Sequence, residues 1–386
     1  MKITDIKTFV VNCYRTNWVF VKIETDEGVS GLGEATLEQK EQTVIAAIEE
    51  LRRYLMGKDP RNIELHYHQM YRDSYWRIGP VLMSAISGIE MALWDISAKY
   101  LGTPVYMMLG GKYNTQVKAY ANAWFSGADS PKEFGKAAKE AVGRGFKALK
   151  WDPFGKAYMN ISHHELDSAL ENIAEVRAAV GPTVDLAIEG HGRFNVSSAC
   201  LISKKIEEFE PMFFEEPVPP DDIDSLLQVK KKSNISIASG ERLLTRYQFK
   251  DLFEKRAVDI AQPDVSHAGG ILECRKIASM AEARYINFAP HNPSGPVANA
   301  ATLQIAACTP NFFMLEMMAN DIPWRKKITD ERLIFKDGYF EIQDSPGLGI
   351  SLNEDALTDY PYSPTELRHY RGDLTDIRPA NAEPYF

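Results

Sequence analysis

The stretch Val-Asp-Leu-Ala-Ile-Glu at residues 184–189 sets the pattern from which the fold follows. A short apolar run ends in an acid, and the same form recurs in Met-Phe-Phe-Glu, ending at Glu215, and in Ile-Ala-Ser-Gly-Glu, ending at Glu241. Starting from Glu189, successive acids are 26 residues apart. Short apolar runs are typical of buried parallel strands. The interval suits one strand and one returning helix, so it predicts a repeated strand–helix unit.

The same alternation continues on both sides of this stretch. Eight apolar runs have the length of strands, at residues 116–121, 146–151, 184–189, 211–215, 235–239, 257–261, 286–290 and 311–315. Helical periodicity lies between most of them, at residues 131–144, 164–180, 198–209, 223–231, 246–255, 270–283 and 296–307. This order predicts an α/β fold with a (β/α)₈ barrel of the modified TIM type over residues 116–335. An irregular, aromatic-rich segment follows the last strand in place of a clear helix.

The chain before the barrel has a different order. Residues 2–12 and 18–25 alternate like strands, and helical periodicity then dominates between residues 39 and 100. Strands followed by helices, without alternation, predict an α+β capping domain over residues 1–115. Residues 336–386 form a short tail that we expect to return to this domain and complete it.

Composition argues against several other classes of protein. The 386 residues carry 53 acidic and 44 basic side chains, and a net charge of -9 speaks against nucleic acid as a partner. The longest apolar segment, residues 81–94, is shorter than a membrane span and contains Glu90, so we expect a core helix. Gly31-Leu32-Gly33 lacks the third glycine of a dinucleotide site and predicts a plain turn. Scattered cysteines and no signal-peptide pattern favour a reducing cytoplasm.

The three acids that end these apolar runs, Glu189, Glu215 and Glu241, would lie side by side in a barrel. The carboxyl ends of the strands meet at one mouth, where barrel active sites are built. Carboxylate oxygens are the ligands that Mg²⁺ prefers, so Glu189, Glu215 and Glu241 predict a magnesium site. The alternative, that they are unrelated acids at strand ends, stays open at this point.

Other polar residues end neighbouring strands. Lys150 and Asp152 close the second barrel strand and face the same way by alternation, although a surface ion pair is the alternative. His191 lies two residues beyond Glu189, between glycines that permit close approach of a ligand. As a lone loop histidine, it has an equally good structural interpretation.

A second histidine has a carboxylate on the adjacent strand. His291 ends the seventh strand and Asp264 ends the sixth. A carboxylate that holds one imidazole nitrogen raises the basicity of the other, which is how a histidine general base is made. Glu316 ends the eighth strand, where we expect it to hydrogen-bond a substrate oxygen.

With these residues, the chain resembles the enolase superfamily, in its mandelate racemase-like branch. The resemblance spans nearly the whole chain. It is carried by Ser-Ala-Ile-Ser-Gly-Ile-Glu-Met-Ala-Leu-Trp-Asp at residues 84–95, Leu109-Gly110-Gly111, Glu215-Glu216-Pro217, Gly240-Glu241-Arg242 and the Asp264/His291 pair. It implies that Glu189, Glu215 and Glu241 bind Mg²⁺, that Asp264 and His291 form the base dyad, and that Glu316 hydrogen-bonds the substrate.

Two departures from the family pattern narrow the expected reaction. The first metal ligand is usually Asp, whereas this chain has the longer Glu189. Racemases carry Lys-x-Lys at the second strand, whereas this chain has Lys150-Trp151-Asp152 and so lacks a second-face base. Together with His191, this pattern is similar to the aldonate dehydratases of the arabinonate, gluconate and galactonate type. In the galactonate type, the histidine at the position of His191 is the acid that expels hydroxyl.

The expected reaction is therefore Mg²⁺-dependent dehydration of a sugar acid to a 2-keto-3-deoxy acid. His291 would remove the C2 proton and His191 would protonate the leaving C3 hydroxyl. Lys150 would stabilise the carboxylate or enediolate, and Asp152 would hydrogen-bond a hydroxyl or modulate Lys150. Epimerisation or lactone cycloisomerisation through the same enediolate is the nearest alternative. A non-catalytic sugar-acid-binding barrel is the alternative from another class.

Substrate specificity is expected to come from the capping domain and from loops over the barrel mouth. The candidate contacts are polar or aromatic, and each has a solvated loop as its alternative: Arg15, Trp18, Tyr75, Trp76, Arg193 and Trp324. Beyond a small-molecule substrate, we expect neither nucleic acid nor membrane as a partner. Relatives of this kind are commonly dimers or octamers, so a homo-oligomer is expected.

Overall fold

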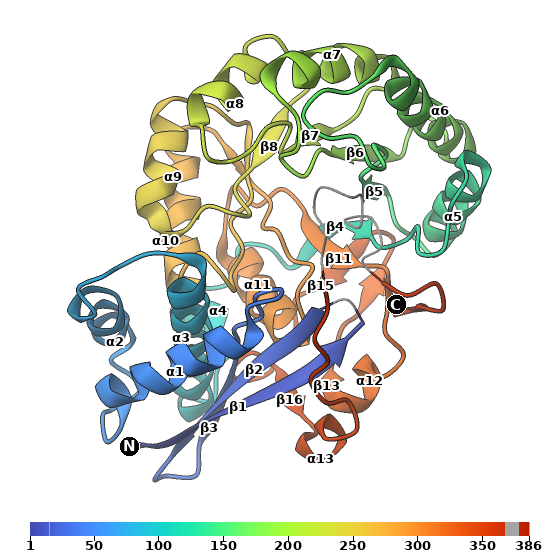
Figure 1. Cartoon of the computed structure of the whole chain (residues 1–386). Helices are drawn as coiled ribbons and strands as arrows, with labels where there is room; N and C mark the ends of the chain where they lie inside the picture. Colours follow the sequence, from blue (N-terminus) through green and yellow to red (C-terminus); the bar gives the residue numbers. More distant parts are fainter. Residues whose placement is uncertain (15, 367–377, 386) are drawn as a thin grey trace.

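The computed structural model describes residues 1–14, 16–366 and 378–385 (Figure 1). It confirms the predicted α/β fold, in which an N-terminal unit of strands and helices stands beside a barrel of parallel strands surrounded by helices. The N-terminal unit contains the antiparallel strands β1 (Ile3–Cys13), β2 (Thr16–Thr25) and β3 (Ser30–Glu34). Its helices are α1 (Glu41–Leu55), α2 (Ile63–His68), a π-helical turn (Gln69–Asp73), α3 (Pro80–Tyr100) and α4 (Val105–Met108).

Helix α3 is the core of the N-terminal unit. It is long and apolar enough to cross a membrane by length and composition alone, but 89% of its apolar window is buried inside the protein. Strand β3 packs so closely on it that a Cβ at Gly33 would lie 1.8 Å from the carbonyl oxygen of Gly88. The turn predicted at Gly31-Leu32-Gly33 is therefore wrong. These glycines belong to a strand whose backbone touches a helix, where no side chain fits.

The barrel strands run parallel and close into a ring. They are β4 (Gln116–Asn122), β5 (Ala148–Trp151), β6 (Asp185–Glu189), β7 (Phe213–Glu215), β8 (Ile237–Ser239), β9 (Ile260–Ala261), β10 (Asn287–Phe288) and β11 (Leu315–Met318). Each strand from β4 to β10 pairs with the next, and β11 pairs with β4. A bridge between Phe288 and Phe312 completes the circle. The eight predicted strands are thus all present, although all except β4 are shorter than the apolar runs and β11 begins four residues later than its run.

Seven helices wrap the barrel in the predicted order (Figure 1). They are α5 (Pro131–Gly143), α6 (His163–Val180), α7 (Val196–Ile206), α8 (Ile223–Lys230), α9 (Thr245–Glu254), α10 (Ile271–Glu282) and α11 (Pro296–Cys308). Local signals set some of these ends. Helix α6 begins with a capping box between Ser162 and Glu165, and it ends at Gly181, whose positive φ of 78° suits glycine.

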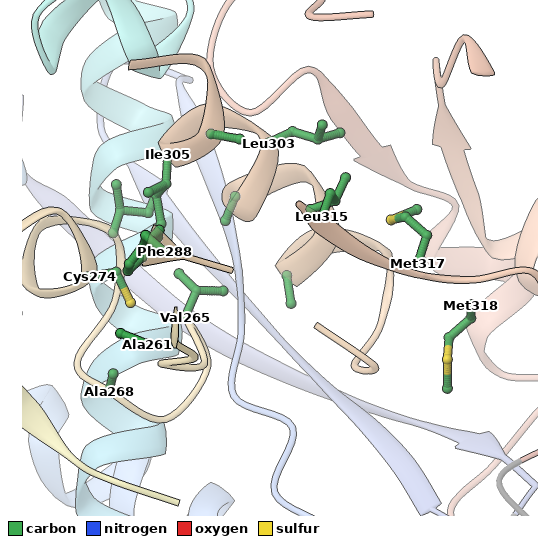
Figure 2. Packing of buried hydrophobic residues seen from close by; sticks show 14 of the residues in the cluster. Ala261, Val265, Ala268, Cys274, Phe288, Leu303, Ile305, Leu315, Met317 and Met318 are labelled. Atoms are coloured by element: carbon green, nitrogen blue, oxygen red, sulfur yellow. The ribbon is translucent and has the colours of Figure 1, made fainter. Parts of the chain in front are cut away.

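Two apolar layers hold the barrel together. Inside the ring, six strands and the residues that adjoin β10 and β11 contribute to one buried cluster: Tyr120, Ala148, Ala187, Phe213, Ala238, Ile260, Ala289 and Met314. Outside the ring, strands pack against helices. Figure 2 shows part of this outer layer, where Cys274 of α10, Phe288 of β10 and Ile305 of α11 gather. Because the lower part of the ring is filled with side chains, a ligand can enter only at the mouth.

The C-terminal tail contacts both units. Strand β15 (Tyr339–Glu341) pairs antiparallel with β4 of the barrel. Farther along, the Tyr360 carbonyl oxygen accepts a hydrogen bond of 2.9 Å from the backbone N–H of Asn12 in the N-terminal unit. The tail also bonds to the N-terminal unit soon after β15, where the backbone N–H of Gly347 donates to the Thr103 carbonyl oxygen at 3.0 Å, so it joins both units along its length.

Candidate active site

A cavity of about 470 Å³ opens at the carboxyl ends of the barrel strands. Its floor and walls come mainly from the residues at these strand ends, including Lys150, Glu189 and His291. The N-terminal unit contributes Thr16, Thr36, Leu37, Glu38 and Pro80, and the tail contributes Arg378. All three parts of the chain thus enclose one space, as expected for a barrel mouth covered by a capping unit.

Three carboxylates meet at this mouth. Glu189 ends β6, Glu215 ends β7 in direct register with it, and Glu241 follows β8. One oxygen of each lies within 4.8 Å of the others. Burial and the neighbouring Glu215 charge raise the pKa of Glu189 well above its usual value. Buried acids this close repel each other unless a cation is bound between them. Their hard oxygen donors fit Mg²⁺, so these three residues would hold it.

Lys150 is the cation that the protein itself supplies to this cluster. Its Nζ lies 2.7 Å from Glu215 Oε1, 2.9 Å from Glu316 Oε1 and 3.5 Å from Glu189 Oε2. Burial disfavours the ammonium, but the charges of Glu215 and Glu316 outweigh it and raise the pKa of Lys150 well above its usual value. Lys150 is therefore held as an ammonium ion at the edge of the cluster.

The predicted pair of His291 and Asp264 is formed. His291 Nδ1 is 2.8 Å from Asp264 Oδ2, while its Nε2 lies 3.4 Å from Glu241 Oε2 at the cavity wall. Burial alone would lower the pKa of His291, but the Glu241 charge and the hydrogen bond to Asp264 raise it to about 10. A base must be neutral before it can accept a proton. The Glu241 charge must consequently be engaged by another cation when the base works, which also suits a metal ligand.

A second imidazole–carboxylate pair lies across the ligand strands from the first. His191 Nδ1 is 2.6 Å from Asp152 Oδ2, and the backbone N–H of His191 donates to Glu189 Oε1 at 2.6 Å. Asp152 also accepts two hydrogen bonds from Arg193 Nη2, at 2.6 and 2.8 Å. Burial would raise the pKa of Asp152, but Arg193 and His191 keep it below its usual value. Asp152 thus pairs with His191 and Arg193, and its predicted hydrogen bond to a substrate hydroxyl or influence on Lys150 stays a prediction.

Glu316 is placed differently from the prediction. It is the second residue of β11 and not the last, and its side chain is fully buried. Its Oε1 accepts from Asn122 Nδ2 at 2.8 Å and its Oε2 from the backbone N–H of Asn292 at 2.9 Å. Asn122 lines the cavity in front of it. Glu316 therefore contacts two cavity residues, Asn122 and Lys150, and its direct contact with substrate stays a prediction.

The predicted specificity residues do not gather at the cavity. Trp18 and Arg193 do not line it, both side chains are buried at 0% and 1% exposure, and Arg193 is committed to Asp152, so their contact with substrate stays a prediction. Tyr75 and Trp76 are 79% and 84% exposed on the outside of the N-terminal unit. Trp324 stacks on Tyr360 and donates to the Asn12 carbonyl at 2.9 Å. Arg15 lies outside the described residues.

Several residues of the site escaped the sequence interpretation. Gln262 Nε2 donates to Glu215 Oε2 at 2.8 Å, and Arg242 pairs with the buried Glu216. His267 lines the cavity and lies 3.9 Å from Asp264. For Gln262 a signal existed, because it precedes Asp264 by two residues in the segment that follows β9, and alternation continued past the strand would turn both side chains the same way. For His267 and Arg242, which lie in turns, alternation gives no information.

Comparisons with known proteins agree with this geometry. Residues 3–110 match the family model described as the mandelate racemase / muconate lactonizing enzyme N-terminal domain. Residues 133–356 match the model described as enolase C-terminal domain-like. Both parts of the chain therefore match families that occur together in the enolase superfamily.

Individual relatives extend along nearly the whole chain. A D-galactonate dehydratase of Pectobacterium atrosepticum is 38% identical over 366 residues, which are 93% of this chain and 94% of the relative. A D-gluconate dehydratase of Thermoproteus tenax is 36% identical, covering 90% of this chain and 71% of the relative. Among solved structures, a mandelate racemase/muconate lactonizing enzyme-like protein from Roseovarius sp. TM1035 superposes with a TM-score of 0.90. It shares 33% identity and covers 95% of this chain and 97% of its own.

Proposed function

Because the chain belongs to the mandelate racemase/muconate lactonizing enzyme family of the enolase superfamily, we propose that it is a Mg²⁺-dependent sugar-acid dehydratase. The observation that carries this proposal is the presence of two imidazole–carboxylate pairs that flank the three ligand strands. Asp152 and His191 follow β5 and β6, whereas Asp264 and His291 follow β9 and β10. A dehydratase needs such a division, since one group must remove a proton while another delivers one.

The carboxylate cluster addresses the first difficulty of the reaction. A proton next to a carboxylate is very weakly acidic, because its removal places a second negative charge on the same group. When bound by Glu189, Glu215 and Glu241, Mg²⁺ supplies the positive charge that stabilises this enediolate electrostatically. Lys150 adds a fixed ammonium ion beside the same cluster, 2.7 Å from Glu215.

His291 removes the C2 proton. Its Nδ1 is held by Asp264, so Nε2 is the nitrogen that faces the cavity. The carboxylate fixes the tautomer and supports the imidazolium that forms. The electron pair of the C2–H bond passes into the enediolate.

His191 completes the elimination from the other side. Its Nδ1 is held by Asp152, and the backbone of the same residue is fixed to Glu189, so its free ring nitrogen is oriented toward the cavity. A proton from His191 joins the C3 hydroxyl, which leaves as water while the enediolate collapses to an enol. The enol then tautomerises to a 2-keto-3-deoxy acid. Atoms balance, because the product is the substrate minus one water.

Lys150 argues against a two-base racemase. Lys150 is engaged in ion pairs with Glu215 at 2.7 Å and Glu316 at 2.9 Å, which suits a fixed positive charge better than a second base. The position two residues on, where racemases carry a further lysine, is Asp152. The relatives named as D-galactonate and D-gluconate dehydratases support the same choice.

The proposal is tested by incubating the full chain with a panel of aldonates and aldarates, with Mg²⁺ or with EDTA, and measuring keto-acid formation. We expect at least one aldonate to yield a 2-keto-3-deoxy acid only when Mg²⁺ is present. Exchange of the C2 hydrogen with solvent but no keto acid would instead indicate epimerisation or cycloisomerisation. Binding without either reaction would indicate a non-catalytic sugar-acid-binding protein.

A further inference from the structure

Two acids of the N-terminal unit are buried against the barrel, away from the carboxylate cluster. Glu34, the last residue of β3, and Glu90, in the middle of α3, are both fully buried. Burial raises the pKa of each carboxyl to about 7, even though hydrogen bonds oppose this shift. Burying a carboxylate is costly, so what these two acids contact in the barrel is informative.

Glu90 holds the start of helix α10. Its carboxylate accepts hydrogen bonds from the backbone N–H groups of Ile271 at 2.7 Å and Leu272 at 3.0 Å. The turn that leads from Asp264 runs directly into this helix. Ser84 and Ser87, on the same face of α3, bond to His267 at 2.8 Å and to the Gly269 N–H at 3.0 Å. One face of α3 therefore contacts the whole turn that follows Asp264.

Glu34 holds the start of helix α11 in the same manner. Its carboxylate accepts from the backbone N–H groups of Gly295 at 2.6 Å and Ala298 at 2.9 Å. The loop that begins at His291 ends at Gly295, which is the N-cap residue of α11. The two acids thus cap the two barrel helices that directly follow the two members of the base dyad.

Glycines make this approach possible at both places. Gly270 is the N-cap of α10, and a Cβ there would lie 2.1 Å from Glu90 Oε2. At Gly295, a Cβ would lie 2.7 Å from Glu34 Oε1. Each helix start is therefore shaped to admit a carboxylate from the N-terminal unit, where the exposed N–H groups and the helix dipole favour negative charge.

We propose that Glu34 and Glu90 are positioning residues that set the relative placement of Asp264 and His291 from the N-terminal unit. This inference rests on the proposed function, in which that pair is the base. A proton-transfer geometry tolerates little error, and a displacement of about 1 Å can reduce a rate roughly 100-fold. The unit that covers the substrate would then also hold the base in its working position.

A third buried acid of the same unit provides the matched control. Asp95 of α3 is also fully buried and accepts two backbone hydrogen bonds, from Leu32 at 2.8 Å and Leu348 at 2.8 Å. These partners lie in β3 and in the tail, not in the loops that carry the dyad. Asp95 also pairs with Lys99 Nζ at 2.6 Å, so Asp95→Asn removes a buried carboxylate with at least as many partners and leaves the dyad loops untouched.

The experiment compares Glu34→Gln, Glu90→Gln and Asp95→Asn in the full chain with Mg²⁺. We expect all three to lower the unfolding temperature. The Gln variants should lose roughly 10- to 100-fold in kcat and in C2-hydrogen exchange, with KM changed less than about threefold. Asp95→Asn should keep kcat. Gly295→Ala retains the Glu34 carboxylate but displaces it, so it should show the same loss of kcat as Glu34→Gln. It replaces Glu34→Gln in the comparison if that variant does not fold.

A second readout requires no substrate and so stands apart from the proposed dehydration. Amide hydrogen exchange should accelerate at residues 264–272 in Glu90→Gln and at residues 291–298 in Glu34→Gln, with each segment unchanged in the other variant. Equal losses of kcat in all three variants would overturn the proposal. So would acceleration spread evenly over the chain, since both results describe general destabilisation.

Discussion

The two imidazole–carboxylate pairs of the barrel mouth look alike but are surrounded differently. Each has a histidine Nδ1 within 2.8 Å of an aspartate that is almost fully buried. Asp152, however, shares its charge between His191 and the guanidinium of Arg193. Asp264 faces His291 and the more distant His267, and His291 also faces Glu241. The same two residue types are thus placed in two different electrostatic settings.

This difference explains how one site can contain a base and an acid. Around His291, negative charge predominates and favours uptake of a proton. Around His191, Arg193 already balances the charge of Asp152, so negative charge does not predominate there. The two roles therefore come from the charged residue beside each imidazole–carboxylate pair, Arg193 in one and Glu241 in the other, and not from the histidines themselves.

Removing the base should have the largest effect. His291→Asn keeps a polar side chain beside Asp264 but cannot accept the C2 proton. We expect kcat to fall about 10³-fold or more, and C2-hydrogen exchange with solvent to fall equally. Steady-state kinetics and NMR-monitored exchange provide the two measurements. Near-normal dehydration by this variant would show that another group is the base.

Removing Arg193 should make the acid pair resemble the base pair. Arg193→Met leaves the buried Asp152 with only His191 as its charged partner among the residues that surround it in the structure. Breaking a buried ion pair costs about 3–5 kcal/mol, so the free energy of unfolding in urea should decrease by an amount of that order. A change below about 1 kcal/mol would mean that Arg193 does not balance Asp152.

The electrostatic setting of His291 should also appear in the pH dependence of stability. Its pKa of about 10 in the folded protein exceeds the ordinary 6.5. The extra stability is therefore fully present below pH 6.5 and is lost as the pH rises toward 10, at up to about 1.4 kcal/mol per pH unit. The metal-free wild type should lose stability relative to His291→Asn over this range. Parallel curves would show that the charges around His291 do not act as described.

The smallest effect is expected outside both pairs. Trp76 is 84% exposed on the outer side of the N-terminal unit. Trp76→Ala should change the free energy of unfolding by less than about 0.5 kcal/mol and leave kcat and KM unchanged. A substantial rise in KM would support the predicted role of Trp76 in substrate binding. It would mean that the segment carrying Trp76 lies over the cavity when substrate is bound.

Much of this arrangement is encoded locally. The equal spacing of Glu189, Glu215 and Glu241 places them on consecutive strands, because each strand–helix unit returns the chain to the same mouth. His291 and Asp264 could be paired for the same reason. Strand-end acids and histidines in a parallel barrel are therefore predictable from sequence alone.

Other features depend on packing that no local pattern reveals. Trp18 was a candidate because it is an aromatic residue of the N-terminal unit. Nearly every residue of β2 is buried, however, so Trp18 joins the core. Arg193 was a candidate substrate contact by proximity, whereas its partner Asp152 comes from a different strand. Glu316 was predicted to end the eighth strand because the apolar run at residues 311–315 precedes it. This run begins about four residues earlier than β11, so Glu316 lies inside the strand. In each case the deciding neighbour is distant in sequence.

The most direct test of the division between the two pairs uses His191→Asn. This variant retains Asp264 and His291 but lacks the acid that protonates the leaving hydroxyl. In D₂O with Mg²⁺ and an aldonate that the wild type dehydrates, we expect keto-acid formation to fall roughly 100-fold or more while deuterium still enters at C2. Loss of both activities to the same extent would contradict the account, because it would show that the two histidines do not perform separate steps.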